Sequence, residues 1–168
     1  QPSINHPDNA VFGAIIQIIG TGRTSRLHKS LVKEKKIAVS TSAWNGWNKY
    51  PGLFVFSAVP AKGHTGQECE QAIYDQIEIL KTELVSPEEL KKAKTNVRAG
   101  IIRDLNSNFA LAMNLAFYDV ITGDWRNLFR ELDKIERVTA GDIQRVAKEY
   151  FTSKNRSVGI IQTTGAEQ

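Results

Sequence analysis

The architecture of this chain depends most on residues 20–44, Gly20-Thr-Gly-Arg-Thr-Ser-Arg-Leu-His-Lys-Ser-Leu-Val-Lys-Glu-Lys-Lys-Ile-Ala-Val-Ser-Thr-Ser-Ala-Trp44. The stretch opens with a turn broken by Gly20 and Gly22 and continues with leucines at helical spacing. It closes on a run rich in β-branched residues, which is typical of a strand. Because glycine commonly follows the last residue of a helix, the stretch predicts the end of one helix, a tight turn, a second helix and a strand.

The helix before this turn is expected over residues 10–19, where apolar side chains recur at helical spacing. Asp8 or Asn9 can serve as its N-cap. The strand after the second helix is expected at residues 37–44. A further apolar run at 53–59 follows two turn signals and predicts a second strand, paired antiparallel with the first.

Helix-start signals follow the two strands. Thr65-Gly-Gln-Glu68 and Ser86-Pro-Glu-Glu89 are capping boxes, and Pro87 suits the first position of a helix. Further helices are expected at 109–122 and 125–137, and a last one opens at Thr139. We expect a final strand at 157–162 and a frayed tail at 163–168.

This order of elements predicts an α+β fold, in which helices pack on one face of an antiparallel sheet. The strands are not interleaved one for one with helices, as they would be around a parallel sheet. A chain of 168 residues, of which 41% are hydrophobic, suits one domain with a substantial core. We therefore expect residues 1–168 to form a single domain.

Composition narrows the classes of function. The net charge of +4 is mild, and the basic residues are interleaved with glutamates, so a nucleic-acid partner is not expected. One cysteine excludes an intrachain disulfide, and no apolar run reaches the length of about 18 residues that a membrane span needs. No signal peptide is visible either.

Residues suited to catalysis or metal binding are sparse. The histidines are His6, His28 and His64, and neither H-E-x-x-H nor H-x-x-E-H occurs. We expect His28 to lie at the surface or cap a helix. Cys69 falls on the apolar face of a predicted helix and is expected to be buried and inert. The sequence predicts no catalytic residue and no metal ligand in this chain.

The glycine-broken turn is the best candidate for binding. Gly20, Gly22, Arg23 and Arg26 lie within it, and free amides at the start of the next helix can bind an anion. Three interpretations stay open: a structural helix end, a contact with a substrate or neighbouring domain, and nucleotide binding. The turn follows a helix and lacks the spacing of a P-loop, which disfavours the last.

A second candidate surface is the aromatic cluster Trp44, Trp47 and Tyr50 in the predicted loop between the strands. These side chains form an interface, offer a platform for a ligand, or pack over the end of the hairpin. The sequence leaves these three possibilities open.

Several motifs then match one family in order. Its members read Gly-Gly-Gly-x-x-Ser-Arg-Leu-(Phe/Tyr)-x-x-Leu-Arg-Glu-x-x-Gly-Leu-Ala-Tyr, which corresponds here to Gly20 through Val39. Further matches lie at these positions: Pro51-Gly-Leu-Phe54, Ser86-Pro-Glu-Glu-Leu90, Gly123-Asp-Trp125, Val138-Thr-Ala-Gly-Asp142, Val146 through Phe151 and Asn155-Arg-Ser-Val158. The chain thus resembles the C-terminal domain of the pitrilysin/insulinase-type zinc peptidases, which include mitochondrial processing peptidase.

The resemblance implies a metal-free domain that encloses a peptide and pairs with a zinc-carrying H-x-x-E-H domain, in the same chain or in a partner subunit. Zinc then belongs to that partner and not to this domain. Many members supply an Arg and a Tyr toward the substrate, but the matching positions here are Val32 and Val39. Valine cannot donate a hydrogen bond to an oxyanion, so no catalytic role is carried over.

Three functions stay open at this point. The first is the closing, C-terminal-type domain of a longer two-domain zinc peptidase, which alone is expected to be inactive. The second is a non-catalytic assembly or scaffold subunit of the same fold, in which a dimer is also open. The third is an anion- or nucleotide-binding module. The type of member resembled suggests the bacterial periplasm as the compartment.

Overall fold

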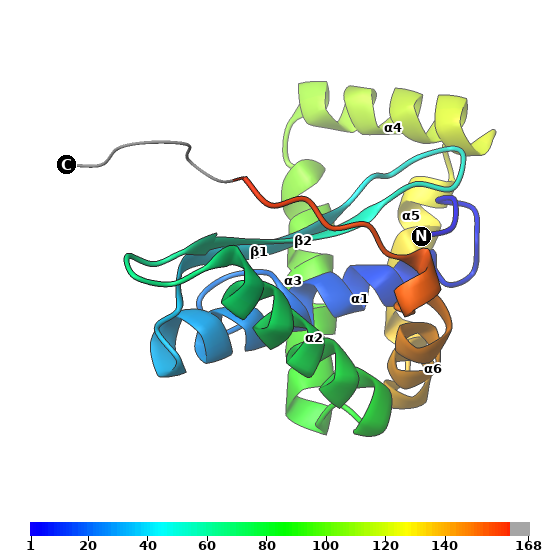
Figure 1. The fold of residues 1–168 in the computed structure, drawn as a ribbon. Coiled ribbons are helices and arrows are strands. Elements are labelled where there is room, and N and C mark those ends of the chain that lie inside the picture. The colour runs from blue at the N-terminus through cyan, green and yellow to red at the C-terminus, as the bar shows by residue number, and fades with distance from the viewer. Residues whose placement is uncertain (162–168) are drawn as a thin grey trace.

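The computed structural model describes residues 1–161, except for the side chain of Asp104. Helices dominate this part of the chain, and one antiparallel pair of strands completes it (Figure 1). The elements in order are α1 (Asn9–Ile19), η1 (His28–Glu34), β1 (Ala38–Asn45), β2 (Phe54–Pro60), α2 (Gly66–Thr82), α3 (Pro87–Asp104), α4 (Asn108–Thr122), α5 (Asn127–Arg137), α6 (Ala140–Tyr150) and η2 (Ser153–Asn155). The α+β prediction is confirmed.

The two strands pair as expected, with Ala43 opposite Phe56 and a register irregularity between Ala38 and Ser40. Phe54, Phe56 and Ala58 pack against the hydrophobic core on one face of the hairpin. Alternation along a strand sends neighbouring side chains to opposite faces. In Figure 1 the hairpin lies between α4 above and α1, α2 and α6 below.

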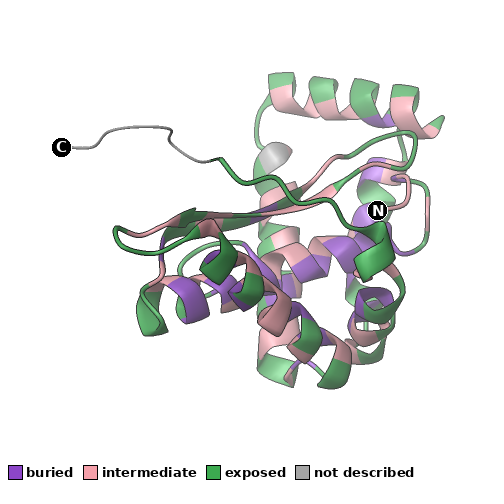
Figure 2. Ribbon diagram, in the orientation of Figure 1, coloured by how far each residue is buried: buried purple, intermediate pink, exposed green. Residues whose placement is uncertain are grey.

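The core gathers around Phe12 on α1, which is 1% exposed. Its ring lies 5.6 Å from that of Phe54 on β2, 5.1 Å from that of Tyr150 and 6.0 Å from that of Phe151, measured between centroids. Three elements distant in sequence therefore meet at one aromatic side chain. Figure 2 shows the buried residues concentrated on α1 and its neighbours, while α4 is mostly exposed or half-buried.

Local sequence signals placed the helix starts well. Capping boxes open α2 at Thr65, α3 at Ser86 and α6 at Thr139, as predicted. Helix α4 ends at Gly123, whose φ of 81° is a left-handed conformation that glycine adopts without strain. Helix α5 begins two residues later than expected, because the chain first makes a tighter turn in which the backbone N–H groups of Asn127 and Leu128 donate to the carbonyls three residues back.

Other expectations were wrong in detail. The helix expected between the turn and β1 is present with Leu27 and Leu31 buried, but at His28–Glu34 it has the wider π-helical form. Asp8 stands at the N-cap of α1 but makes no side-chain cap, because its carboxylate is bonded to Arg145.

Among the described residues none of the helices is long and apolar enough to cross a membrane.

The expected final strand is also wrong for residues 157–161, which form no strand. The chain here runs along α2: the Arg156 guanidinium lies 4.1 Å from the centre of the Tyr74 ring, and the side chain of Ile160 lies against Gly66. These contacts hold the segment on α2, and it pairs with neither strand of the two-stranded sheet. Gln162 and the tail at 163–168 lie outside the described residues.

Candidate functional site

The glycine-broken turn joins α1 to η1, and Gly20 sets how closely it approaches the sheet. A Cβ atom at Gly20 would lie 2.5 Å from the backbone nitrogen of Ala43 and 2.8 Å from its Cα. Backbone atoms cannot move aside as a flexible side chain can, so only glycine allows the end of α1 to touch β1. Gly20 therefore has a structural reason to be glycine.

Gly22 and Ser25 shape the rest of the turn. Gly22 has a φ of 77°, in the left-handed region that favours glycine. The buried Ser25 hydroxyl donates a 2.9 Å hydrogen bond to the Gly22 carbonyl, and its oxygen accepts one of 3.4 Å from the backbone N–H of His28. The turn is thus tied to the first residues of η1.

Arg26 points away from solvent toward the start of α3. Its Nε donates to Glu89 Oε1 at 3.0 Å, and its Nη2 donates to Oε2 at 2.7 Å. The Arg26 side chain is 15% exposed, and Glu89 also closes the capping box of α3 with Ser86. The hydrogen bond from Arg26 holds the pKa of the Glu89 carboxyl below its ordinary value. One carboxylate therefore fastens the turn and caps a helix.

Arg23 is the exposed cation of the turn. Its side chain makes no ion pair or hydrogen bond with the described part of the chain. Next to it, the Thr24 hydroxyl accepts a hydrogen bond from Lys92 of α3. Of the residues predicted to bind a substrate, the structure places Gly20, Gly22 and Arg23 in one turn and engages Arg26 in the ion pair.

The two valines at the family's Arg and Tyr positions lie on either side of a strained residue. Val32 is half-buried against the core, and Val39 is 64% exposed beside the irregularity in β1. Between them Lys36 has a φ of 54°, at the position where family members carry glycine. Neither valine offers a polar group to a ligand.

The side chains suited to metal binding do not converge. Within the described residues no group of three or more His, Cys, Asp or Glu side chains could hold a metal ion. His64 lies 3.3 Å from Glu68, and His6 lies 3.7 Å from Asp8, each with one carboxylate. Cys69 is buried, as expected, and its burial raises the pKa of the thiol. The donor set does not fit a zinc site.

The aromatic loop residues do not form a covered cluster. Trp44, Trp47 and Tyr50 all keep large exposed surfaces. Both tryptophans line a hollow of about 980 Å³, together with Thr21 of the glycine-broken turn. Sequence reasoning missed this hollow, because its walls come from elements that are distant along the chain.

Comparison with known proteins identifies the family. The model of the peptidase M16 inactive domain matches residues 1–97, which is more than half of the 168-residue chain. This chain belongs to the peptidase M16 inactive domain family. The sequence had already indicated this membership, since the M16 family is the one that contains the pitrilysin and insulinase peptidases.

Individual relatives agree with this assignment. The chain is 27% identical over 150 residues to the zinc protease PqqE of Helicobacter pylori, covering 89% of this chain and 34% of that protein. It is 22% identical over 135 residues to human cytochrome b-c1 complex subunit 2, covering 80% of this chain and 30% of that subunit. The chain therefore spans about a third of the curated relatives it matches.

A solved structure supports the fold. The crystal structure of an inactive peptidase domain from Bordetella parapertussis superposes with a TM-score of 0.85 at 24% identity. The match covers 100% of this chain and 91% of that one. At this identity the likeness establishes the fold alone.

Proposed function

We propose that this chain is the non-zinc-binding domain of a zinc metalloendopeptidase, which encloses the peptide substrate and pairs with a zinc-carrying H-x-x-E-H domain. One observation carries the proposal: a chain that matches an inactive-domain family also spans 34% of a relative named as a zinc protease. A catalytic zinc site needs about three protein ligands and an open position for water. The described side chains here offer no such set, and in our proposal the zinc and its chemistry are supplied by the partner domain.

The turn at residues 20–26 is the part of this domain that we assign to the substrate. Arg23 is exposed and has no partner among the described residues, so its guanidinium is available to a carboxylate or carbonyl of a peptide. Gly20 and Gly22 set the path of the backbone, and Arg26 holds the turn against α3 through Glu89. In this scheme Arg26 is a positioning residue.

The experiment is a kinetic comparison in the protein that contains both domains. Arg23→Gln should raise KM for a peptide substrate several-fold and leave kcat nearly unchanged, because it removes binding that is equal in the ground and transition states. Arg137→Gln, a change at another exposed arginine outside the turn, is the control. An unchanged KM would remove Arg23 from the substrate site.

A second function is favoured by the match to cytochrome b-c1 complex subunit 2, whose name describes a component of an assembly. In this alternative the chain is a non-catalytic assembly or scaffold subunit of the same fold. Purification under native conditions separates the two. A zinc-carrying peptidase domain, covalently attached or tightly associated, supports the first function, and a complex without zinc supports the second.

A further inference from the structure

A hollow of about 980 Å³ runs along one face of α1. It is lined by residues of α1, the end of β1, the second half of α3, α4 and α5. The volume lies at the upper end of the range of about 300–1,000 Å³ that is usual for ligand sites. It is thus large enough for several residues of an extended chain.

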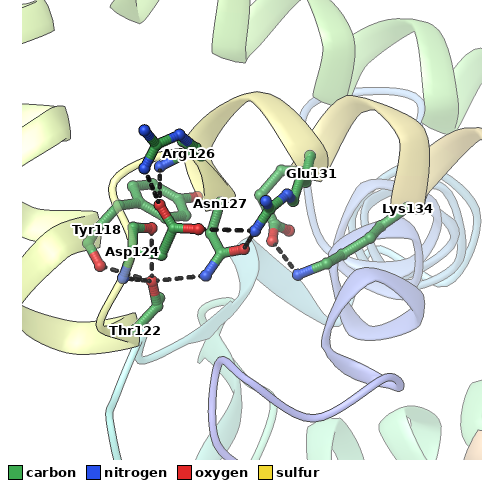
Figure 3. Close-up of polar contacts among 8 residues, drawn as sticks. Tyr118, Thr122, Asp124, Arg126, Asn127, Glu131 and Lys134 are labelled. Carbon is green, nitrogen blue, oxygen red and sulfur yellow. Dashed lines mark hydrogen bonds and ion pairs between the residues drawn. The ribbon is translucent and has the colours of Figure 1, made fainter.

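Helices α4 and α5, which both line the hollow, are joined at their corner by a polar network, drawn in Figure 3. The Asn127 side chain donates a 2.9 Å hydrogen bond to the Thr122 hydroxyl, and Asp124 Oδ2 lies 2.9 Å from Nη1 of Arg130. Deeper in the same corner, Glu131 is 5% exposed and pairs with Lys134 at 2.6 Å. Glu131 is thus paired within the chain, whereas Arg103, which also lines the hollow, forms no ion pair with a described residue and donates its Nε only to the Ala99 carbonyl.

Four residues with amide side chains that form no hydrogen bond within the described chain line the hollow. Asn9, Gln17, Asn45 and Asn96 line it from α1, β1 and α3, and none of the four side chains forms a hydrogen bond with a described residue. Asn9 is only 6% exposed. None of these amides is among the buried polar groups left without a partner in the described chain, so their donors and acceptors are open to solvent in the hollow and available to a ligand.

The remaining surface of the hollow combines aromatic walls with open space. Trp44, Trp47 and Phe117 line it and keep exposed ring surface. Gly13 on α1 and Gly100 on α3 line it as well, and a Cβ at either position would meet nothing within 4 Å. Glycine inside a helix costs about 1 kcal/mol of stability relative to alanine. Two helical glycines at one hollow keep open space there at the expense of helix stability.

We propose that this hollow binds an extended segment of the peptide substrate that carries a bulky apolar side chain. Each amide side chain offers both donors and an acceptor, and an extended peptide has free N–H and C=O groups to match them. A helix has already bonded its own backbone and would gain little from the amides. The aromatic walls take the apolar side chain. This inference rests on the proposed function, because it states where the enclosed peptide lies.

The test is calorimetric titration of the 168-residue chain with a blocked, uncharged nonapeptide of alternating serine and threonine around a central phenylalanine. The matched probe is the same peptide with alternate backbone nitrogens methylated, which keeps the side chains and removes donors. We expect the methylated peptide to bind at least tenfold more weakly. Equal binding of the two peptides, or no binding of the first at millimolar concentration, would overturn the inference.

Variants locate the binding. Gly100→Leu adds a side chain into the open hollow and improves helix propensity, so the fold is expected to persist while affinity falls at least tenfold. Gly141→Leu in the first turn of α6 lies away from the hollow and should bind as the parent chain does. Asn96→Ala should weaken binding several-fold, and Asn5→Ala should not. Unchanged affinity in Gly100→Leu contradicts the assignment.

Failure of this inference can be told apart from failure of the proposed function. If the two-domain protein hydrolyses peptides equally well with and without Gly100→Leu, the hollow is not the substrate site, although the proposed function stands. If that protein neither holds zinc nor cleaves peptides, the proposed function fails. In that case the titration with the methylated peptide still tests whether the hollow binds an extended peptide.

Discussion

Arg26 and Glu89 form a two-point ion pair, with nitrogen–oxygen distances of 3.0 and 2.7 Å, although 63 positions separate them in sequence. The planar guanidinium fork matches the two carboxylate oxygens, which makes this one of the stronger types of ion pair. It joins the turn after α1 to the first turn of α3. The geometry of the predicted substrate-binding turn therefore depends on a residue far from it.

Glu89→Gln should lower the free energy of unfolding by about 1–2 kcal/mol at neutral pH, less than a fully buried pair would lose because Glu89 is partly exposed. Urea unfolding measures the change. Glu88→Gln, an exposed neighbour without this pair, is the control and should change stability by no more than about 0.5 kcal/mol. Equal effects of the two substitutions would mean that the pair contributes nothing.

The same pair predicts a pH dependence. The folded-state pKa of Glu89 lies below its ordinary value of 4.5, first because of the hydrogen bond from Arg26. The stabilisation is therefore fully present above pH 4.5 and is lost as the pH falls through the folded-state pKa. The stability difference between the parent chain and Glu89→Gln should shrink on acidification from pH 6. A difference that stayed constant would contradict this.

Gly20→Ala should destabilise the chain by about 1–3 kcal/mol or more, because the added Cβ collides with the backbone of Ala43. Gly13→Ala is the matched control on the same helix: its Cβ enters open space, so a gain of up to about 1 kcal/mol is expected. Thermal unfolding followed by circular dichroism compares them. A Gly20→Ala variant as stable as Gly13→Ala would show that α1 does not need this approach to β1.

Lys36→Gly should raise stability by about 0.5–1 kcal/mol, since Lys36 has a φ of 54° and a side chain strains that conformation. The adjacent Lys35 has a φ of −74°, so Lys35→Gly should instead destabilise the chain. Opposite signs for two neighbouring Lys→Gly substitutions are the outcome that supports the strain. A loss of stability in both would exclude it.

Asp8→Asn should lower the free energy of unfolding by about 1–3 kcal/mol. The buried Asp8 carboxylate accepts hydrogen bonds of 2.5 and 3.3 Å from Arg145 and one of 3.2 Å from the Tyr150 hydroxyl. These contacts fasten the start of α1 to α6. Asp133→Asn, an exposed change on α5, serves as the control, and a chemical denaturation series on both variants measures the effect.

Local signals in the sequence were enough for most of the fold. The helix starts are marked by side-chain caps that involve residues only three positions apart, at Thr65, Ser86 and Thr139. The end of α4 is marked by the glycine that follows it. Both kinds of signal can be recognised in the sequence without knowledge of the tertiary structure. The prediction of a final strand at 157–162 was wrong for the described residues. Its basis was β-branched composition, which does not show whether a segment will pair with a neighbouring strand.

The site was less accessible to sequence reasoning. The sequence analysis assigned Gly20 to substrate binding. The close approach to Ala43 that requires glycine at this position joins residues far apart in sequence, so it could not be predicted. The sequence analysis assigned Arg26, like Arg23, to substrate binding. It identified Glu89 as part of a helix cap but could not show that Glu89 is the ion-pair partner of Arg26. The amides of the hollow carry no motif, since Asn9, Asn45 and Asn96 converge only after α1, β1 and α3 have packed together.

The most direct test of the central claim measures zinc content and peptide hydrolysis for the 168-residue chain alone and for the protein that joins it to an H-x-x-E-H domain. The account predicts no stoichiometric zinc and no hydrolysis for the chain alone, and both for the joined protein. Stoichiometric zinc together with hydrolysis by the chain alone would contradict it.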